Sequence, residues 1–95
     1  MKVVVDARAF EDLERIHAFI AAARPVIADA VVDRILSSIE KLGEFPAMAR
    51  TGQVEGTREW VIPRLPYIAV YKVDVESDVL TVIAVFHGAQ DRDGK

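Results

Sequence analysis

The chain has 95 residues, a net charge of −3, and 52% hydrophobic and 28% charged side chains, which predicts one globular domain over residues 1–95 and excludes a disordered chain. The absence of cysteine excludes a disulfide framework and a thiolate metal site, and it fits a cytoplasmic protein. No apolar run reaches the roughly 18 residues of a membrane span, and Asp6 interrupts the apolar core that an export signal would require.

The first half of the chain predicts one strand and two helices. Lys2–Asp6 is short and mostly β-branched, and Asp6 is placed to cap the helix that follows. That helix is expected to end at Arg24, because a residue before proline disfavours the helical region. Pro25 suits the start of a second helix, which should end near Gly43, and so short a connection predicts an antiparallel hairpin. The apolar stripes at helical spacing are Phe10, Leu13, Ile16, His17 and Ile20, then Val31, Ile35, Ile39 and Leu42.

The second half of the chain changes to the period of β-strands. After a loop rich in Gly and Pro, strands are expected at Arg58–Pro63, Tyr67–Asp74 and Val79–His87, joined by tight turns. The polar tail after His87 is expected to be frayed. The predicted fold class is therefore α+β in the order β-α-α-β-β-β, with the helical hairpin packed on a small, mostly antiparallel sheet.

The last predicted strand is apolar at almost every position. From Val79 to Phe86 the only polar residue is Thr81, and such a run is typical of a strand that is covered on both faces. Because one helical hairpin covers only one face of a four-stranded sheet, the pattern predicts an exposed apolar surface that a partner protein covers. The alternative is a sheet so twisted that the two helices wrap most of it.

The charge balance bears on the kind of target. Proteins that work by binding phosphates usually carry a basic excess, and this chain is acidic. Between Arg50 and Lys72, however, four cationic side chains occur with two anionic ones. These charges are either a local basic patch or scattered surface groups, and the sequence leaves both interpretations open.

A set of short segments follows one order across nearly the whole chain. They are Asp12–Ile20 (DLERIHAFI), Ala28–Leu42 (ADAVVDRILSSIEKL), Phe45-Pro46, Gly56–Glu59 (GTRE), Tyr67–Tyr71 (YIAVY) and the closing VFHGAQD. In order and spacing they resemble the RelE/ParE family of toxins from bacterial type II toxin–antitoxin systems. Ala49 departs from the pattern, since such sequences often have glycine before the arginine.

The resemblance implies a compact αβ domain that a cognate antitoxin neutralises by wrapping over it. It implies contact with operator DNA only through the antitoxin. No membrane partner, cofactor or metal is expected. The RelE-like branch cleaves messenger RNA in the ribosome, and the ParE-like branch inhibits DNA gyrase by protein–protein contact. A non-toxic module that only binds an antitoxin is a third alternative.

The residues of the nuclease motif favour the ParE-like branch. RNA-cleaving relatives usually have arginine after the first tyrosine of the Tyr67–Tyr71 motif, where this chain has Ile68, and some end their last strand with His-Tyr, where this chain has His87-Gly88. Losing one electrostatic stabiliser typically costs about 10²–10³-fold in rate. No catalytic residue is therefore assigned, and the endonuclease alternative would use His87 and Arg58.

Six side chains are candidates for contact with the target or the antitoxin: Arg50, Arg58, Trp60, Arg64, Tyr67 and His87. Each also has a structural interpretation. His87 closes a strand, Trp60 is either a core anchor or a binding anchor, and Arg58 either contacts a target or pairs with a nearby glutamate. Tyr67 and Tyr71 are four residues apart in one strand, so they should share a face of the sheet.

Overall fold

The computed structural model describes residues 1–52 and 54–89, apart from the side chain of Arg50. Its elements are β1 (Lys2–Val5), α1 (Ala7–Ala21), α2 (Pro25–Leu42), β2 (Arg50–Thr51), β3 (Arg58–Val61), β4 (Tyr67–Asp74) and β5 (Val79–His87). The predicted order is confirmed, and the predicted bounds of β4 and β5 are those observed. The part of the expected frayed tail that follows Ala89 lies outside the described residues.

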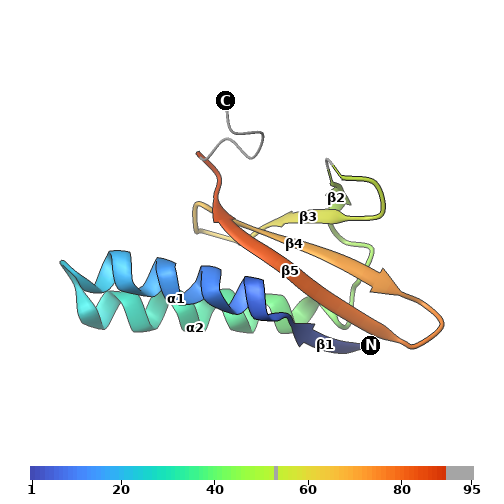
Figure 1. Cartoon of the computed structure of the whole chain (residues 1–95), viewed down its shortest axis with the longest axis horizontal. Coiled ribbons are helices and arrows are strands. Elements are labelled where there is room, and N and C mark those ends of the chain that lie inside the picture. The colour runs from blue at the N-terminus through green and yellow to red at the C-terminus, as the bar shows by residue number, and fades with distance from the viewer. Residues whose placement is uncertain (53, 90–95) are drawn as a thin grey trace.

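The strands form one sheet in the order β1-β5-β4-β3-β2. β1 pairs with β5 in parallel and the other neighbours pair antiparallel, which confirms a mostly antiparallel sheet. The loop before β3 contributes the additional strand β2, which pairs through only two residues. The first and last strands of the chain thus lie side by side, as Figure 1 shows.

Local sequence signals start the two helices. The Asp6 carboxylate accepts the N–H of Ala9 at 2.9 Å and caps α1, and Pro25 occupies the first turn of α2. α2 ends at Leu42 and Gly43 is its C-cap residue, but the φ of Gly43 is −62°, so this glycine does not adopt the left-handed conformation. A Cβ at this position would lie 2.7 Å from the Met1 carbonyl oxygen and 2.8 Å from Val3 Cγ2. Close packing against β1 therefore requires glycine here.

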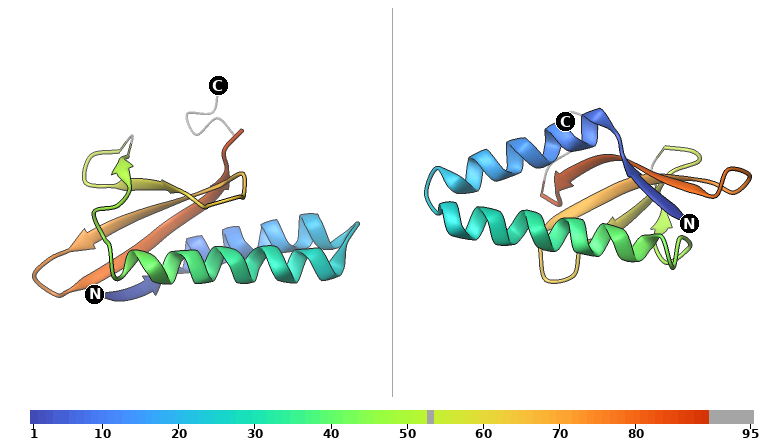
Figure 2. Two further views of the ribbon diagram at one scale, coloured as in Figure 1. Left: turned by 180° about the vertical axis from the view of Figure 1, so that it is seen from behind. Right: turned by 90° about the horizontal axis from the view of Figure 1, so that it is seen from below.

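Both helices pack on one face of the sheet (Figure 2) and enclose the core with it. Leu13, Ile35 and Ile39 contribute buried side chains from the predicted stripes. Phe10 does not, because 58% of it is exposed, so its assignment to the core stripe is wrong. His17 is half-buried and its Nε2 lies 2.7 Å from Asp29 Oδ1, which places it at the rim between the two helices.

The face of the sheet turned away from the helices is not bare at β4. Every residue from Tyr67 to Tyr71 is buried, including Ile68 and Val70, whose side chains alternate to that far face. Glu59 and Phe86 pair beside Val70 and Ile68 and help to cover them. The prediction of an exposed apolar sheet face is wrong at this strand.

Exposed apolar side chains lie mainly on the helices and loops. Among the large exposed hydrophobic residues that the structure describes, only Val4 and Val61 belong to strands. The others are Phe10, Phe19, Val26, Ile27, Leu36, Phe45, Met48, Val54 and Val75. In the part of the chain that the structure describes, neither helix has the length and apolar character needed to span a membrane.

Candidate functional site

A hollow of about 670 Å³ opens between α1 and the C-terminal end of β5. We call it the α1–β5 hollow. Figure 1 shows why it exists: β5 rises away from α1 toward its C-terminal end, so helix and sheet diverge. It is lined by Arg8, Asp12, Arg15, Ile16, Phe19, Tyr67, Ala84, Val85, Phe86 and His87.

The path of the chain places α1 along this part of β5. β1 pairs with β5 only as far as Val5 and Val82, and the N–H of Asp6 donates to the Val82 carbonyl at 3.0 Å. α1 follows at once, and its residues 8, 12, 15 and 19 lie on one side because they are spaced by four, three and four. A single face of α1 therefore supplies two arginines, a carboxylate and a phenylalanine to the hollow.

Asp12 ties α1 to β5 across the floor of the hollow. Its Oδ2 accepts the N–H of Val85 at 3.0 Å, and its Oδ1 accepts a hydrogen bond from Arg15 Nη2 at 3.2 Å. Val85 is 2% exposed, so its N–H has little access to water. Both carboxylate oxygens are thus engaged within the chain.

We expect Asp12→Ala to lower the free energy of unfolding by about 1–3 kcal/mol, because it leaves the Val85 N–H without its acceptor. Asp12→Asn is the matched control, since its side-chain oxygen still accepts that bond, and it should lose less. Urea unfolding followed by circular dichroism measures both. Equal losses in the two variants would assign the effect to the ion pair with Arg15 and contradict the expectation.

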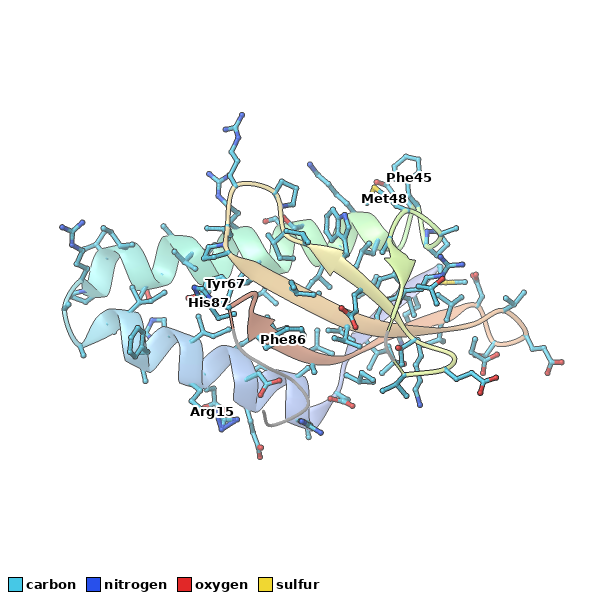
Figure 3. The ribbon with its side chains drawn as sticks, turned by 90° about the horizontal axis from the view of Figure 1, so that it is seen from above. Arg15, Phe45, Met48, Tyr67, Phe86 and His87 are labelled. Atoms are coloured by element: carbon cyan, nitrogen blue, oxygen red, sulfur yellow. The ribbon has the colours of Figure 1, made fainter. Side chains whose placement is uncertain are left out.

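His87 and Tyr67 pair across β4 and β5 at the mouth of the hollow (Figure 3). Their ring centroids are 5.5 Å apart at an interplanar angle of 81°, an edge-to-face contact. His87 Nδ1 accepts the N–H of Ala89 at 3.0 Å, which puts the proton of a neutral imidazole on Nε2. Tyr67 is 8% exposed, so its main role is packing, with one edge toward the hollow.

Gly88 follows His87 where the chain closes back on the β3–β4 turn. Its N–H donates to the Pro66 carbonyl at 2.6 Å, and a Cβ on Gly88 would lie 3.3 Å from the same oxygen. A tyrosine at this position, as in some RNA-cleaving relatives, would have to displace that contact.

Ile68 does not occupy an empty place beside the imidazole. Tyr67 pairs with His87 on the helix side of the sheet, and Ile68 pairs with Phe86 on the far side. The cations that share the hollow with His87 are instead Arg8 and Arg15. Sequence analysis missed both, because they lie on a helix remote in sequence. The only signal was their position on the α1 face described above.

The alternative catalytic pair, His87 and Arg58, is not brought together. Arg58 Nη1 donates to the Ala49 carbonyl at 2.9 Å, and Arg58 lines a separate hollow of about 630 Å³ between β3 and the end of β4. Its cross-strand partner, Tyr71, donates from its hydroxyl to the Pro46 carbonyl at 2.7 Å. Burial raises the pKa of the Tyr71 phenol above its usual value, against the lowering effects of the Ala49 backbone and the Arg58 charge. Arg58 therefore has a structural role at this end of the sheet.

The remaining contact candidates are spread over the molecule. Trp60 is half-buried and packs against the core, which supports its structural interpretation. Arg64 is exposed in the β3–β4 turn with a φ of 66°, and Arg50 lies in β2. Within residues 1–52 and 54–89, no group of three or more His, Asp or Glu side chains is arranged to hold a metal ion.

Comparison with known proteins identifies the family. The model of the ParE toxin of the type II toxin–antitoxin system, parDE, matches residues 3–92. A protein of Sinorhizobium fredii (strain NBRC 101917 / NGR234), named "Putative toxin Y4kP", is 38% identical over 76 residues, which cover 80% of this chain and 79% of that protein.

Solved structures agree on the fold. A chain of the chromosomal ParDE system from P. aeruginosa has a TM-score of 0.82 at 20% identity, covering 92% of this chain and 95% of that one. A chain of the intact E. coli RelBE toxin–antitoxin complex has a TM-score of 0.67 at 16% identity, covering 94% and 98%. The α+β fold and the family match together mean that this chain belongs to the ParE toxins of type II toxin–antitoxin systems.

Proposed function

We propose that this toxin inhibits DNA gyrase by protein–protein contact and that a cognate antitoxin holds it inactive. The proposal rests on the residues at the start of β4 and the end of β5, where RNA-cleaving relatives have their catalytic motif. Of the arginine, histidine and tyrosine set, only His87 is present, and the Ile68 side chain lies on the opposite face of the sheet. The ParE family match supports the same branch.

The chemistry of RNA cleavage makes demands that this chain meets poorly. Splitting a phosphodiester needs a general base and acid, with cations against the transition-state charge. Arg58, the cation named for that role, is bonded to the Ala49 carbonyl in a different hollow. Contact with a protein target needs no such arrangement, and the acidic net charge of −3 suits it.

The antitoxin partner is supported by the structural neighbours. The chains matched in P. aeruginosa and E. coli come from a ParDE system and a RelBE toxin–antitoxin complex. The large exposed apolar side chains on the helices and loops of this chain are the kind of surface that a partner covers.

Purified toxin should stop gyrase supercoiling, because inhibition by protein–protein contact needs neither ribosome nor messenger RNA. Supercoiling of relaxed plasmid measures this, with toxin premixed with antitoxin as the control that restores activity. In cells, gyrase alleles selected for resistance should relieve growth arrest. Full supercoiling activity at saturating toxin would contradict the proposal.

One observation favours ribosome-dependent messenger RNA cleavage as the second candidate. Arg8 and Arg15 line the hollow into which His87 and Tyr67 face, so two guanidinium groups and an imidazole do share one site. That function predicts codon-aligned cuts in messenger RNA on expression. Loss of one transition-state stabiliser should slow cleavage about 10²–10³-fold in His87→Ala or Arg8→Ala, but Arg58→Ala should slow it only if the fold is disturbed.

A further inference from the structure

We infer that the α1–β5 hollow is a docking site for a segment of a partner protein that carries a carboxylate beside large apolar side chains. The inference goes beyond the proposed function, because it concerns the chemistry of the docked segment and stands whether or not gyrase is the target. It rests on the charges around the rim of the hollow and on the apolar part of its lining.

At the rim of the hollow, the charged groups that a ligand can reach are mainly positive. Arg8 is exposed, and among the described residues its guanidinium has neither a hydrogen bond nor an ion pair. Arg15 is 70% exposed at its side chain and makes one bond to Asp12. Among the described residues that line the hollow, Asp12 is the one carboxylate, and both its oxygens are engaged by Arg15 and the Val85 N–H. Within residues 1–52 and 54–89, an incoming carboxylate therefore meets two guanidinium groups and no free anion of the lining.

This local charge contrasts with the whole chain. The net charge is −3, yet the other two carboxylates of α1, Glu11 and Glu14, are outside the lining of the hollow. Acidic surface elsewhere repels an acidic segment, and the hollow attracts it. The charge pattern thus directs such a segment to one place on the molecule.

Apolar side chains form part of the lining of the hollow, beside the engaged carboxylate of Asp12. Ile16, Ala84, Val85 and Phe86 line it from α1 and β5. Phe19, from the same face of α1, is 82% exposed and continues this surface toward the tip of the helical hairpin. Aromatic and arginine side chains together are typical of the energetically important part of protein interfaces. A peptide with apolar side chains would bury Phe19, and a carboxylate on it would reach the arginines.

Two other occupants fit less well. Nucleic acid binding draws on many phosphate contacts and a basic surface, and this acidic chain offers two arginines at the hollow. A second copy of the chain in a symmetric dimer would place identical patches against each other. Arg8 and Arg15 of one copy would then face the same cations of the other, which is unfavourable.

Phage-displayed random peptides, selected against the full-length toxin, test the inference. Enriched peptides should place Asp or Glu within one helical turn of Phe, Leu, Ile or Trp. By fluorescence polarisation, Arg8→Glu combined with Arg15→Glu should weaken their binding about tenfold to a hundredfold, and Phe19→Ser should weaken it as well. Arg34→Glu, the same charge change on the exposed side of α2, should leave it unaltered.

A charge exchange makes the test specific. A selected peptide whose acidic residue is replaced by lysine should lose affinity for the wild-type toxin and regain it for Arg8→Glu. Arg8→Lys should keep most of the binding, and thermal unfolding checks that each variant is folded.

Four results would overturn the inference. They are no enrichment above the unselected library, enriched peptides without a carboxylate, affinity indifferent to the Arg8 and Arg15 changes, and uridine-rich single-stranded RNA or a second toxin copy bound more tightly with the same dependence on the two arginines. None of these results alters the gyrase assay, so the two proposals fail independently.

Discussion

Replacement of Tyr71 by alanine is expected to lower the free energy of unfolding by about 3–5 kcal/mol, the range for emptying a large aromatic site in a core. Tyr71 is fully buried at the centre of the sheet, between Arg58 on β3 and Val82 on β5. Its hydroxyl also holds the loop after α2 through the Pro46 carbonyl, 2.7 Å away. Since native domains are stable by only about 5–15 kcal/mol, this loss is a large fraction of the total, and the variant should unfold at clearly lower urea concentration than the wild type.

Chemical denaturation separates the two contributions of Tyr71. Tyr71→Phe keeps the ring and removes only the bond to Pro46, so it should cost about 0.5–1.5 kcal/mol. The difference between the two variants measures the packing of the ring. A Tyr71→Ala variant as stable as Tyr71→Phe would mean that the ring does not organise the core.

The second large effect is expected for Ile68→Arg, which restores the arginine found in RNA-cleaving relatives. Ile68 is 9% exposed on the far face of the sheet, where it pairs with Phe86. A guanidinium there must either lose its water or force the strands apart. We expect a loss of about 2–4 kcal/mol, as for other buried charges without a partner. Because that face is opposite to His87, no messenger RNA cleavage should appear.

Val61→Arg is the matched control for this variant. Val61 pairs with Ile68 on the same face of the sheet but is 50% exposed, so the same side chain there should change stability by less than about 0.5 kcal/mol. Urea unfolding and primer extension on messenger RNA after expression measure stability and cleavage together. A stable Ile68→Arg variant that cuts transcripts would contradict both the burial argument and the assignment of faces.

The placement of Ile68 also changes the argument about the branch of the family. From the sequence, the missing guanidinium looked like a vacancy next to the imidazole of His87. In the fold that vacancy does not exist, and the cations near His87 come from α1 as Arg8 and Arg15. Substitutions of Arg8 and Arg15 therefore distinguish peptide docking from RNA cleavage better than substitutions of Ile68 do.

The sequence by itself determined the elements and their order. Asp6 as a cap, Pro25 as a helix start, and the β-branched runs at Tyr67–Asp74 and Val79–His87 are local signals, and the structure follows them. The shared face of Tyr67 and Tyr71 followed from the two-residue period of a strand. The short strand β2 could not be predicted in this way. Two residues are too few to show the alternating pattern of a strand, and they pair only because the fold brings them beside β3.

Only the tertiary structure decided which residues meet at the hollow. Strict alternation from Leu80 along β5 would turn His87 away from the helices. The pairing with β4 shifts by one residue between Val70 and Tyr71, skipping Ile83, and so places Val85 and His87 on the helix side together with Leu80 and Val82. The same shift brings the Val85 N–H to Asp12 on α1. Such a change of register depends on contacts between segments more than 70 positions apart in the chain, as Asp12 and Val85 are, and no local pattern encodes it.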